Sequence, residues 1–152
     1  MIVVEHTREL APYLGRELGT SNWVDISESM IIDFGRITRN THWVHSDAER
    51  AKRETPYGGI IAHGFFTLSL VNVLLEEIFE VKGAKRWIIY GVDKLRFTNA
   101  VRAGERVRLK LTLKELEEQK AGAVRMVCGC TMEIEGSERP AMVADYIMIA
   151  YH

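Results

Sequence analysis

The sequence predicts an α+β fold in which a curved antiparallel sheet wraps around one central helix. Three observations lead to this prediction. Residues 56–80 contain an apolar run whose bulky side chains point all the way round a helix, so the helix should be buried on every side. Residues 86–151 contain long runs in which apolar and polar residues alternate. The segments between these runs are short enough to join antiparallel neighbours. A sheet that curves around the helix satisfies all three patterns.

The apolar run does not have the form of a membrane span, which needs about 20 uninterrupted apolar residues. Polar or small residues interrupt it at His63, Gly64, Ser69 and Asn72, and Glu76 then closes it. We therefore expect a buried central helix and no membrane partner.

Length and charge set further bounds. The 152 residues are enough for one domain, residues 1–152, with a proper core. A formal charge of -1 argues against nucleic-acid binding, which needs a basic face. The start of the chain has no basic segment followed by a long apolar one, so no signal peptide is expected. Cys128 and Cys130 lie two apart in one predicted strand, where a disulfide forms poorly. Two free buried thiols and a cytoplasmic location are predicted.

The first half of the chain contains three candidate helices. Thr7 can cap a short helix that carries Leu10 and Leu14. After a short strand at residues 21–26, Ser27 can cap a second helix, whose apolar residues at three-residue spacing predict one buried stripe: Ile31, Phe34 and Ile37. After Thr38 the pattern fails, and residues 39–47 read as an irregular, polar segment. Residues 47–54 read as a short solvated helix that ends before Pro56.

Four long strands are predicted in the second half, at residues 86–97, 105–116, 123–134 and 141–151. In the second of them one face is apolar throughout, formed by Val107, Leu109, Leu111 and Leu113. Such a sheet has free edges, and pairing two copies edge to edge would give a two-fold symmetric dimer. We therefore expect a homodimer.

Polar residues that can do chemistry gather in the irregular segment and at the start of the central helix. His45 is the main candidate for moving protons near neutral pH, although a loop histidine is more often a hydrogen-bonding or surface residue. Gly64 lacks a side chain, so a carbonyl oxygen can approach the free amides of a helix start there. Tight helix packing is the alternative role for this glycine. Ser69 can line the same cavity or bond back to a carbonyl one turn earlier. Asp47 is better explained as a helix cap than as a catalytic carboxylate.

Two segments carry a resemblance to a known family. Residues 38–70, TRNTHWVHSDAERAKRETPYGGIIAHGFFTLSL, and residues 95–107, LRFTNAVRAGERV, resemble the MaoC-like dehydratases. The similarity is to the branch of (R)-specific enoyl-CoA hydratases and nodulation protein N, and it extends over the whole chain. It implies a hot-dog fold, in which a curved antiparallel sheet wraps a long central helix.

The resemblance also implies an activity and a site. Family members add water to trans-2-enoyl-CoA to form (3R)-hydroxyacyl-CoA, or catalyse the reverse dehydration, which makes them lyases of fatty acid metabolism. They use no metal and no cofactor beyond the CoA of the acyl-CoA thioester substrate. Their catalytic histidine corresponds to His45, and their catalytic aspartate falls on Asn40. The glycine whose amide binds the thioester carbonyl corresponds to Gly64, and the pocket serine to Ser69.

Asn40 departs from the family pattern. An amide can orient a water molecule, but it cannot take the proton of that water at working pH. Three interpretations stay open: an engineered inactive variant, a natural enzyme in which His45 carries proton transfer with help from His42, or a protein that binds acyl thioesters without hydrating them. Arg39 and Thr41 differ from the family context too, which favours natural divergence. A hot-dog thioesterase is the remaining alternative, and it would need a carboxylate on the first half of the central helix.

Overall fold

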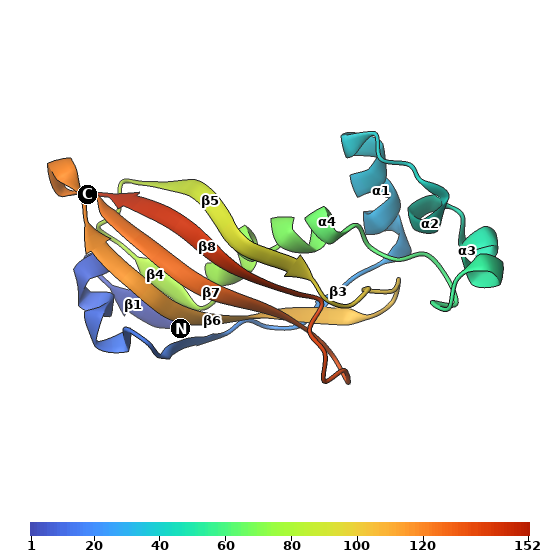
Figure 1. Ribbon diagram of the computed structural model, residues 1–152. Coiled ribbons are helices and arrows are strands. Elements are labelled where there is room, and N and C mark those ends of the chain that lie inside the picture. The colour runs from blue at the N-terminus through green and yellow to red at the C-terminus, as the bar shows by residue number, and fades with distance from the viewer.

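The computed structural model describes residues 1–152. Its main feature is the predicted curved antiparallel sheet (Figure 1). The strand order is β2-β6-β7-β8-β5, and the short β3 also pairs with β6. The strands of this sheet are β2 (Glu17–Thr20), β3 (Val24–Asp25), β5 (Arg86–Phe97), β6 (Arg106–Glu118), β7 (Val124–Ile134) and β8 (Met142–Tyr151). The four long strands therefore form where alternation predicted them.

The apolar faces of the long strands build the core. Val107, Leu109 and Leu111 of β6 are completely buried. On β7, Cys128 lies opposite Leu113 and Cys130 opposite Leu111. Both cysteines are free and buried, as expected. Burial raises the pKa of the Cys128 thiol to about 12, so it is a packing group and not a nucleophile.

The central helix differs from the prediction. It consists of two short segments, α4 (Gly64–Ser69) and α5 (Val71–Leu75), and not one long helix. Val71 and Leu74 are buried, but Phe65 is 66% exposed and Val73 is 55% exposed. The expectation of burial on every side is therefore wrong. The sheet covers only one side of the helix, and the other side stays open within a single chain (Figure 1).

The N-terminal segment adds a feature that the sequence did not indicate. β1 (Ile2–Val4) pairs in parallel with β4 (Phe79–Val81), which directly follows the central helix. The predicted first helix is a 3-10 helix, η1 (Thr7–Tyr13), capped by His6 and not by Thr7. Leu10 is buried in the core as expected, whereas Leu14 is 51% exposed. A second 3-10 segment, η2 (Lys120–Gly122), joins β6 to β7.

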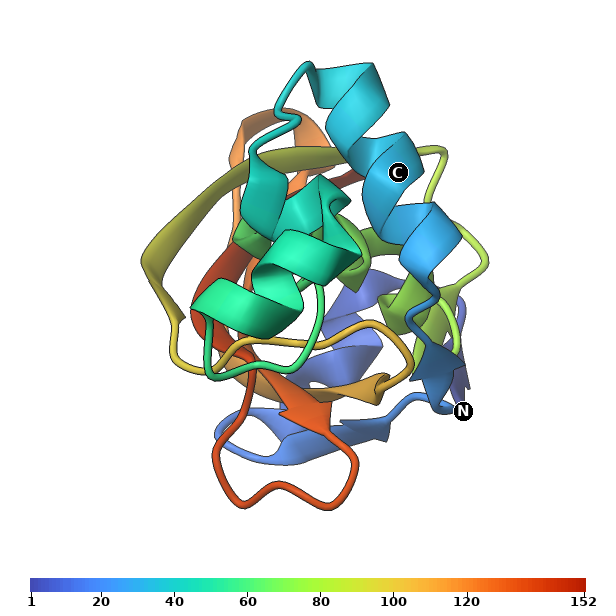
Figure 2. The ribbon, with the colours of Figure 1, turned by 90° about the vertical axis from the view of Figure 1, so that its right-hand side faces the viewer.

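Three helices gather at one end of the sheet (Figure 2). They are α1 (Glu28–Thr38), α2 (Trp43–Ser46) and α3 (Ala48–Glu54). Ser27 caps α1 as predicted, because its hydroxyl accepts a hydrogen bond from the Met30 amide at 3.2 Å. Ile31 is fully buried, but Ile37 is 82% exposed because it lies in the last turn, beyond the core. No helix has both the length and the apolar character that crossing a bilayer requires.

Candidate active site

The segment before α4 is fixed by backbone hydrogen bonds on both sides. The Ile61 amide donates to the Val44 carbonyl of α2 at 3.1 Å. The Ala62 amide donates to the Val101 carbonyl at 2.7 Å, in the loop that follows β5. The loop of residues 60–62 therefore holds the start of α4 between the α2 helix and the residues after β5. This arrangement brings the two polar clusters of the sequence together.

His45, in the last turn of α2, is held by this loop. Its Nδ1 lies 2.7 Å from the Ile61 carbonyl oxygen. Because a carbonyl oxygen only accepts, Nδ1 carries the proton and the free nitrogen Nε2 is the basic one. The side chain is half-buried. Burial lowers the pKa of His45 below its ordinary 6.5, the nearby rings of His63 and His42 lower it further, and the bond to Ile61 opposes them.

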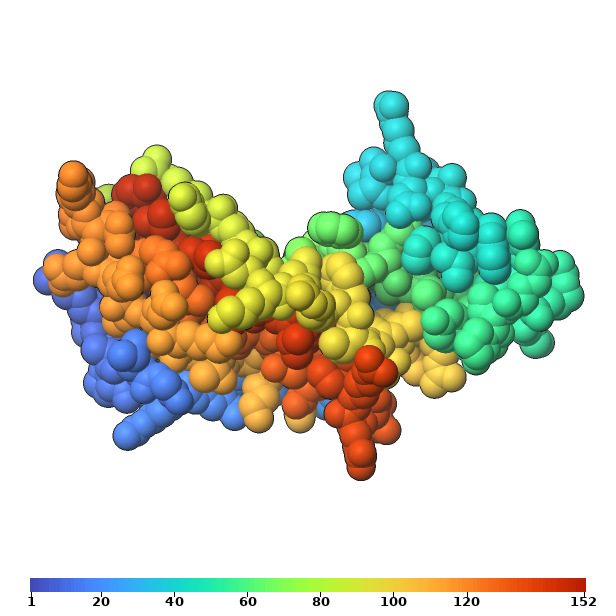
Figure 3. All heavy atoms as spheres, in the orientation of Figure 1, coloured from blue at the N-terminus to red at the C-terminus, as the bar shows by residue number.

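A cavity of about 600 Å³ opens beside His45. Its lining comes from α1 and the segment after it, from α2, from the start of α4 and from the sheet. The lining includes Asn40, His45, Gly64, Ser69, Phe65, Ile89, Val92 and Tyr146. Figure 3 shows a hollow here, between the yellow-green to yellow strand β5 and the cyan helices α1 and α2. All four residues predicted for the site therefore face one cavity.

A second cavity, of about 340 Å³, lies on the other side of the same residues. His45 and Gly64 line both cavities. Its lining also includes Tyr57 and the end of β5, where Phe97 packs directly on Gly64. A Cβ atom added at Gly64 would lie only 2.7 Å from the Phe97 ring. Gly64 is thus required for close packing here. As the first residue of α4, it also has an amide without a partner inside the helix.

Asn40 and Ser69 occupy the cavity in different ways. The Asn40 side chain is exposed and forms no hydrogen bond within the chain, so it is free to contact a ligand or a water molecule. The Ser69 hydroxyl donates to the Phe66 carbonyl at 2.7 Å. Ser69 therefore forms the hydrogen bond to an earlier backbone carbonyl that was one of its two expected roles. It also lines the cavity, which was the other.

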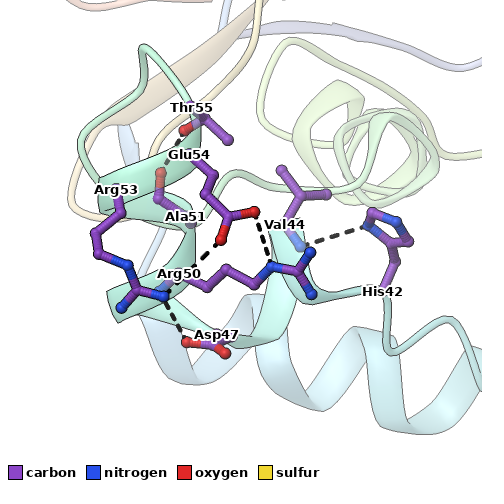
Figure 4. A network of polar contacts seen from close by, with 8 residues as sticks. All are labelled: His42, Val44, Asp47, Arg50, Ala51, Arg53, Glu54 and Thr55. Carbon is purple, nitrogen blue, oxygen red and sulfur yellow. Dashed lines mark hydrogen bonds and ion pairs between the residues drawn. The ribbon is translucent and has the colours of Figure 1, made fainter.

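Asp47 and His42 have structural roles. The Asp47 carboxylate accepts a hydrogen bond from the Arg50 amide at 2.9 Å and caps α3, as predicted. Figure 4 shows this cap together with the ion pair of Arg50 and Glu54 on the same helix. His42 caps α2 through a longer contact, 3.4 Å, from the Val44 amide to its Nδ1. Its ring centroid lies 6.5 Å from that of His45, so it borders the site without packing on it.

Three further residues at the site were not assigned a role from sequence. His63 is only 4% exposed and stacks on His45, with ring centroids 3.8 Å apart. Phe97 presses on Gly64 from the end of β5. Tyr146 reaches the larger cavity from β8, and burial raises the pKa of its phenol. The sequence places His63 directly before Gly64, which could have indicated a role at the site. Phe97 and Tyr146 come from strands far along the chain, so the sequence gives no such indication for them. No group of three or more His, Cys, Asp or Glu residues is placed to hold a metal ion.

Comparison with known proteins agrees with this architecture. Residues 9–132 match the family described as MaoC like domain. The 3-hydroxyacyl-thioester dehydratase Z of Mycobacterium tuberculosis strain H37Rv is 39% identical over 148 residues, which cover 97% of each chain. Nodulation protein N of Rhizobium meliloti strain 1021 is 36% identical over 143 residues, 93% of this chain and 89% of the relative.

A solved structure gives the same result for the fold. The (R)-hydratase from A. caviae involved in PHA biosynthesis has a TM-score of 0.71 to this chain. The match covers 89% of this chain and 94% of that one, at 19% identity. At this level of identity the match establishes a shared hot-dog architecture.

Proposed function

Because the chain belongs to the MaoC-like dehydratase family, we propose that it is a hydro-lyase that hydrates trans-2-enoyl-CoA to (3R)-hydroxyacyl-CoA, or catalyses the reverse dehydration. The observation that carries the proposal is the position of His45 and Gly64 between two cavities. A thioester has two arms, the acyl chain and the pantetheine of CoA, that leave the reacting carbons in different directions. Two cavities that meet at one base and one amide fit such a substrate.

The proposed mechanism uses the free nitrogen of His45. Nε2 takes a proton from water as the water oxygen bonds to C3 of the enoyl group, and the π electrons move toward the thioester carbonyl. The Gly64 amide donates to the carbonyl oxygen, which carries enolate-like charge at that point. His45 then returns the proton to C2 on the same side. The site needs no cofactor in this scheme, so activity should survive treatment with chelators.

Asn40 is proposed to orient the water without sharing its proton. The side chain has no partner within the chain, and it lines the cavity into which the water must enter. A general acid or base typically contributes roughly 10²- to 10⁴-fold in rate. An enzyme with His45 alone would therefore be slower than one with a carboxylate at position 40.

The test follows loss of the enoyl-thioester absorbance with crotonyl-CoA. We expect measurable turnover by the natural chain and a loss of roughly 10²- to 10⁴-fold in the His45→Ala variant. Asn40→Asp should raise kcat, by at most a similar factor. If Asn40→Asp gains nothing and His45→Ala loses nothing, the assigned pair is wrong.

Two other functions are separated by related measurements. An acyl-CoA-binding protein without turnover would bind crotonyl-CoA tightly in calorimetry while the absorbance stayed constant. A hot-dog thioesterase would release free thiol from acyl-CoA. The helix segments α4 and α5 contain no carboxylate, and Glu76 and Glu77 come only after them. We therefore expect no thiol release.

We further propose that the chain acts in the cytoplasm as a homodimer. What supports the location is the pair of free thiols in β7, which suits a reducing compartment. What supports the dimer is β5, which forms one edge of the sheet. Its exposed apolar residues include Ile88, Ile89 and Tyr90. An exposed apolar edge strand is a surface on which a second copy can pair.

A further inference from the structure

His63 contacts both members of the proposed catalytic pair, His45 and Asn40. Its ring stacks on His45, with centroids 3.8 Å apart and planes at 25°. Its Nε2 lies 2.8 Å from the backbone carbonyl oxygen of Asn40. Because the carbonyl accepts, Nε2 of His63 carries the proton and Nδ1 is left as an acceptor. That Nδ1 is buried and has no hydrogen-bond partner.

The local packing is arranged to admit these contacts. A Cβ atom at Gly35 of α1 would lie 2.9 Å from the Asn40 carbonyl oxygen and 3.2 Å from Cε1 of His63. Any residue larger than glycine at position 35 would push these two groups away from α1. Phe34 closes the other side, with its ring centroid 5.2 Å from that of His63. A buried imidazole with one unpaired nitrogen is costly, so its retention calls for a role.

We propose that His63 is a positioning residue of the hydratase site. Its stacked ring fixes the orientation of the His45 ring, and its Nε2 proton fixes the position of the Asn40 backbone carbonyl. This inference rests on the proposed function. His63 itself need not touch the reacting carbons. A base displaced by about 1 Å can lose roughly 10²-fold in rate, so a rigid buried support next to His45 is functionally important.

Two substitutions separate the two contacts. His63→Phe keeps an aromatic ring for the stack and removes the donor to the Asn40 carbonyl. His63→Gln keeps an amide donor near the place of Nε2 and removes the ring. We expect each to lower kcat by roughly 10- to 10²-fold with little change in KM. Gly35→Ala should also lower kcat. Its methyl group would displace the Asn40 carbonyl and the His63 ring, although residue 63 itself is not substituted.

The pH profile gives a readout that a merely structural role would not move. Two further imidazole rings lie beside His45: His42 on its own segment and His63 on the loop before α4. The two cavities also contain one tyrosine each, Tyr57 in the smaller and Tyr146 in the larger. Burial lowers the pKa of His45 and His63 adds to that effect. The acid limb of kcat/KM should therefore move to higher pH in both His63 variants.

The molecule contains a matched control at its other end. His6 and His152 also stack, with centroids 3.6 Å apart and planes at 11°. His152 is the C-terminal residue, which lies at the end of the sheet away from α2 (Figure 1). His6→Gln removes that stack, and it should leave both kcat and the acid limb unchanged.

A second measurement keeps this inference separate from the proposed function. The titration of His45 can be followed by its imidazole proton resonances in NMR, in the natural chain and in each His63 variant, without any substrate. A pKa of His45 that rises in both variants supports the positioning role even if no hydration is observed. Unchanged kcat together with an unchanged His45 titration in folded His63→Phe and His63→Gln would overturn it.

Discussion

The His45 side chain combines partial burial with a fixed tautomer, and this combination makes a specific prediction for pH dependence. Burial lowers the pKa of His45 below 6.5. The residue acts as a base in the proposed reaction, so it must be unprotonated. The unprotonated form persists down to the lowered pKa, and it is lost below it.

We therefore expect kcat/KM for hydration to be flat near neutral pH and to fall only below the ordinary histidine value of 6.5. The measurement is a profile of kcat/KM against pH with crotonyl-CoA. Asn40→Asp provides the control with the opposite sign, because a carboxylate near the ring raises the pKa of His45. An acid limb above the ordinary value in the natural chain would contradict the assigned environment.

Among the helices, the start of α4 depends on having no side chain at position 64. Gly64→Ala would place a methyl group 2.7 Å from the Phe97 ring, so the ring must move into the smaller cavity. We expect kcat/KM to fall by about 10-fold or more, through misplacement of the amide and loss of space. The melting temperature should fall as well, because the methyl group displaces a packed aromatic ring. Gly59→Ala is the control, because nothing lies within 4 Å of a Cβ atom there.

The cap of α3 tests the role of a carboxylate close to the site. Asp47→Ala removes the acceptor for the Arg50 amide, so the free energy of unfolding should fall by about 0.5–2 kcal/mol in chemical denaturation. Asp47→Asn retains a cap and should restore most of that loss. We expect kcat to be unchanged in both variants. A large loss of kcat in the folded Asp47→Asn variant would mean that Asp47 replaces the missing carboxylate at position 40.

The strands of the sheet could be predicted from the sequence, whereas the burial of the central helix and one contact of the site could not. The sequence predicts the four long strands to within two residues of their ends, two of them from alternation and two from extended apolar runs. The predicted burial of Phe65 and Val73 is wrong, because apolar character alone does not tell how far a sheet reaches around a helix. At the site, His45, Asn40 and Gly64 were found from a motif. The stack of His63 on His45 was not, since it depends on how the loop of residues 60–62 returns to α2.

At the scale of the whole molecule, the exposed side of α4 lies next to β5, the exposed edge strand of the sheet. Phe65 of α4 is 66% exposed, and Tyr90 on β5 is 69% exposed. The ring of Phe65 also contacts Phe97 at the end of β5, with centroids 5.7 Å apart. The larger cavity opens along the same boundary, since Phe65 and Ile89 both line it. The partner in the proposed homodimer would cover this boundary.

A charge on the edge strand should therefore prevent assembly. We expect the natural chain to sediment as a dimer, with twice the mass of one chain, and Tyr90→Lys to sediment as a monomer or to dissociate at much higher concentration. Lysine on an edge strand opposes the pairing of that strand with a second copy. Leu14→Lys is the matched control, because Leu14 is 51% exposed but lies after η1, away from β5. A monomeric natural chain, or a Tyr90→Lys variant that still dimerises like the Leu14→Lys control, would place the interface elsewhere. In the monomeric variant KM for crotonyl-CoA should rise, since the cavity beside Ile89 would stay open to water.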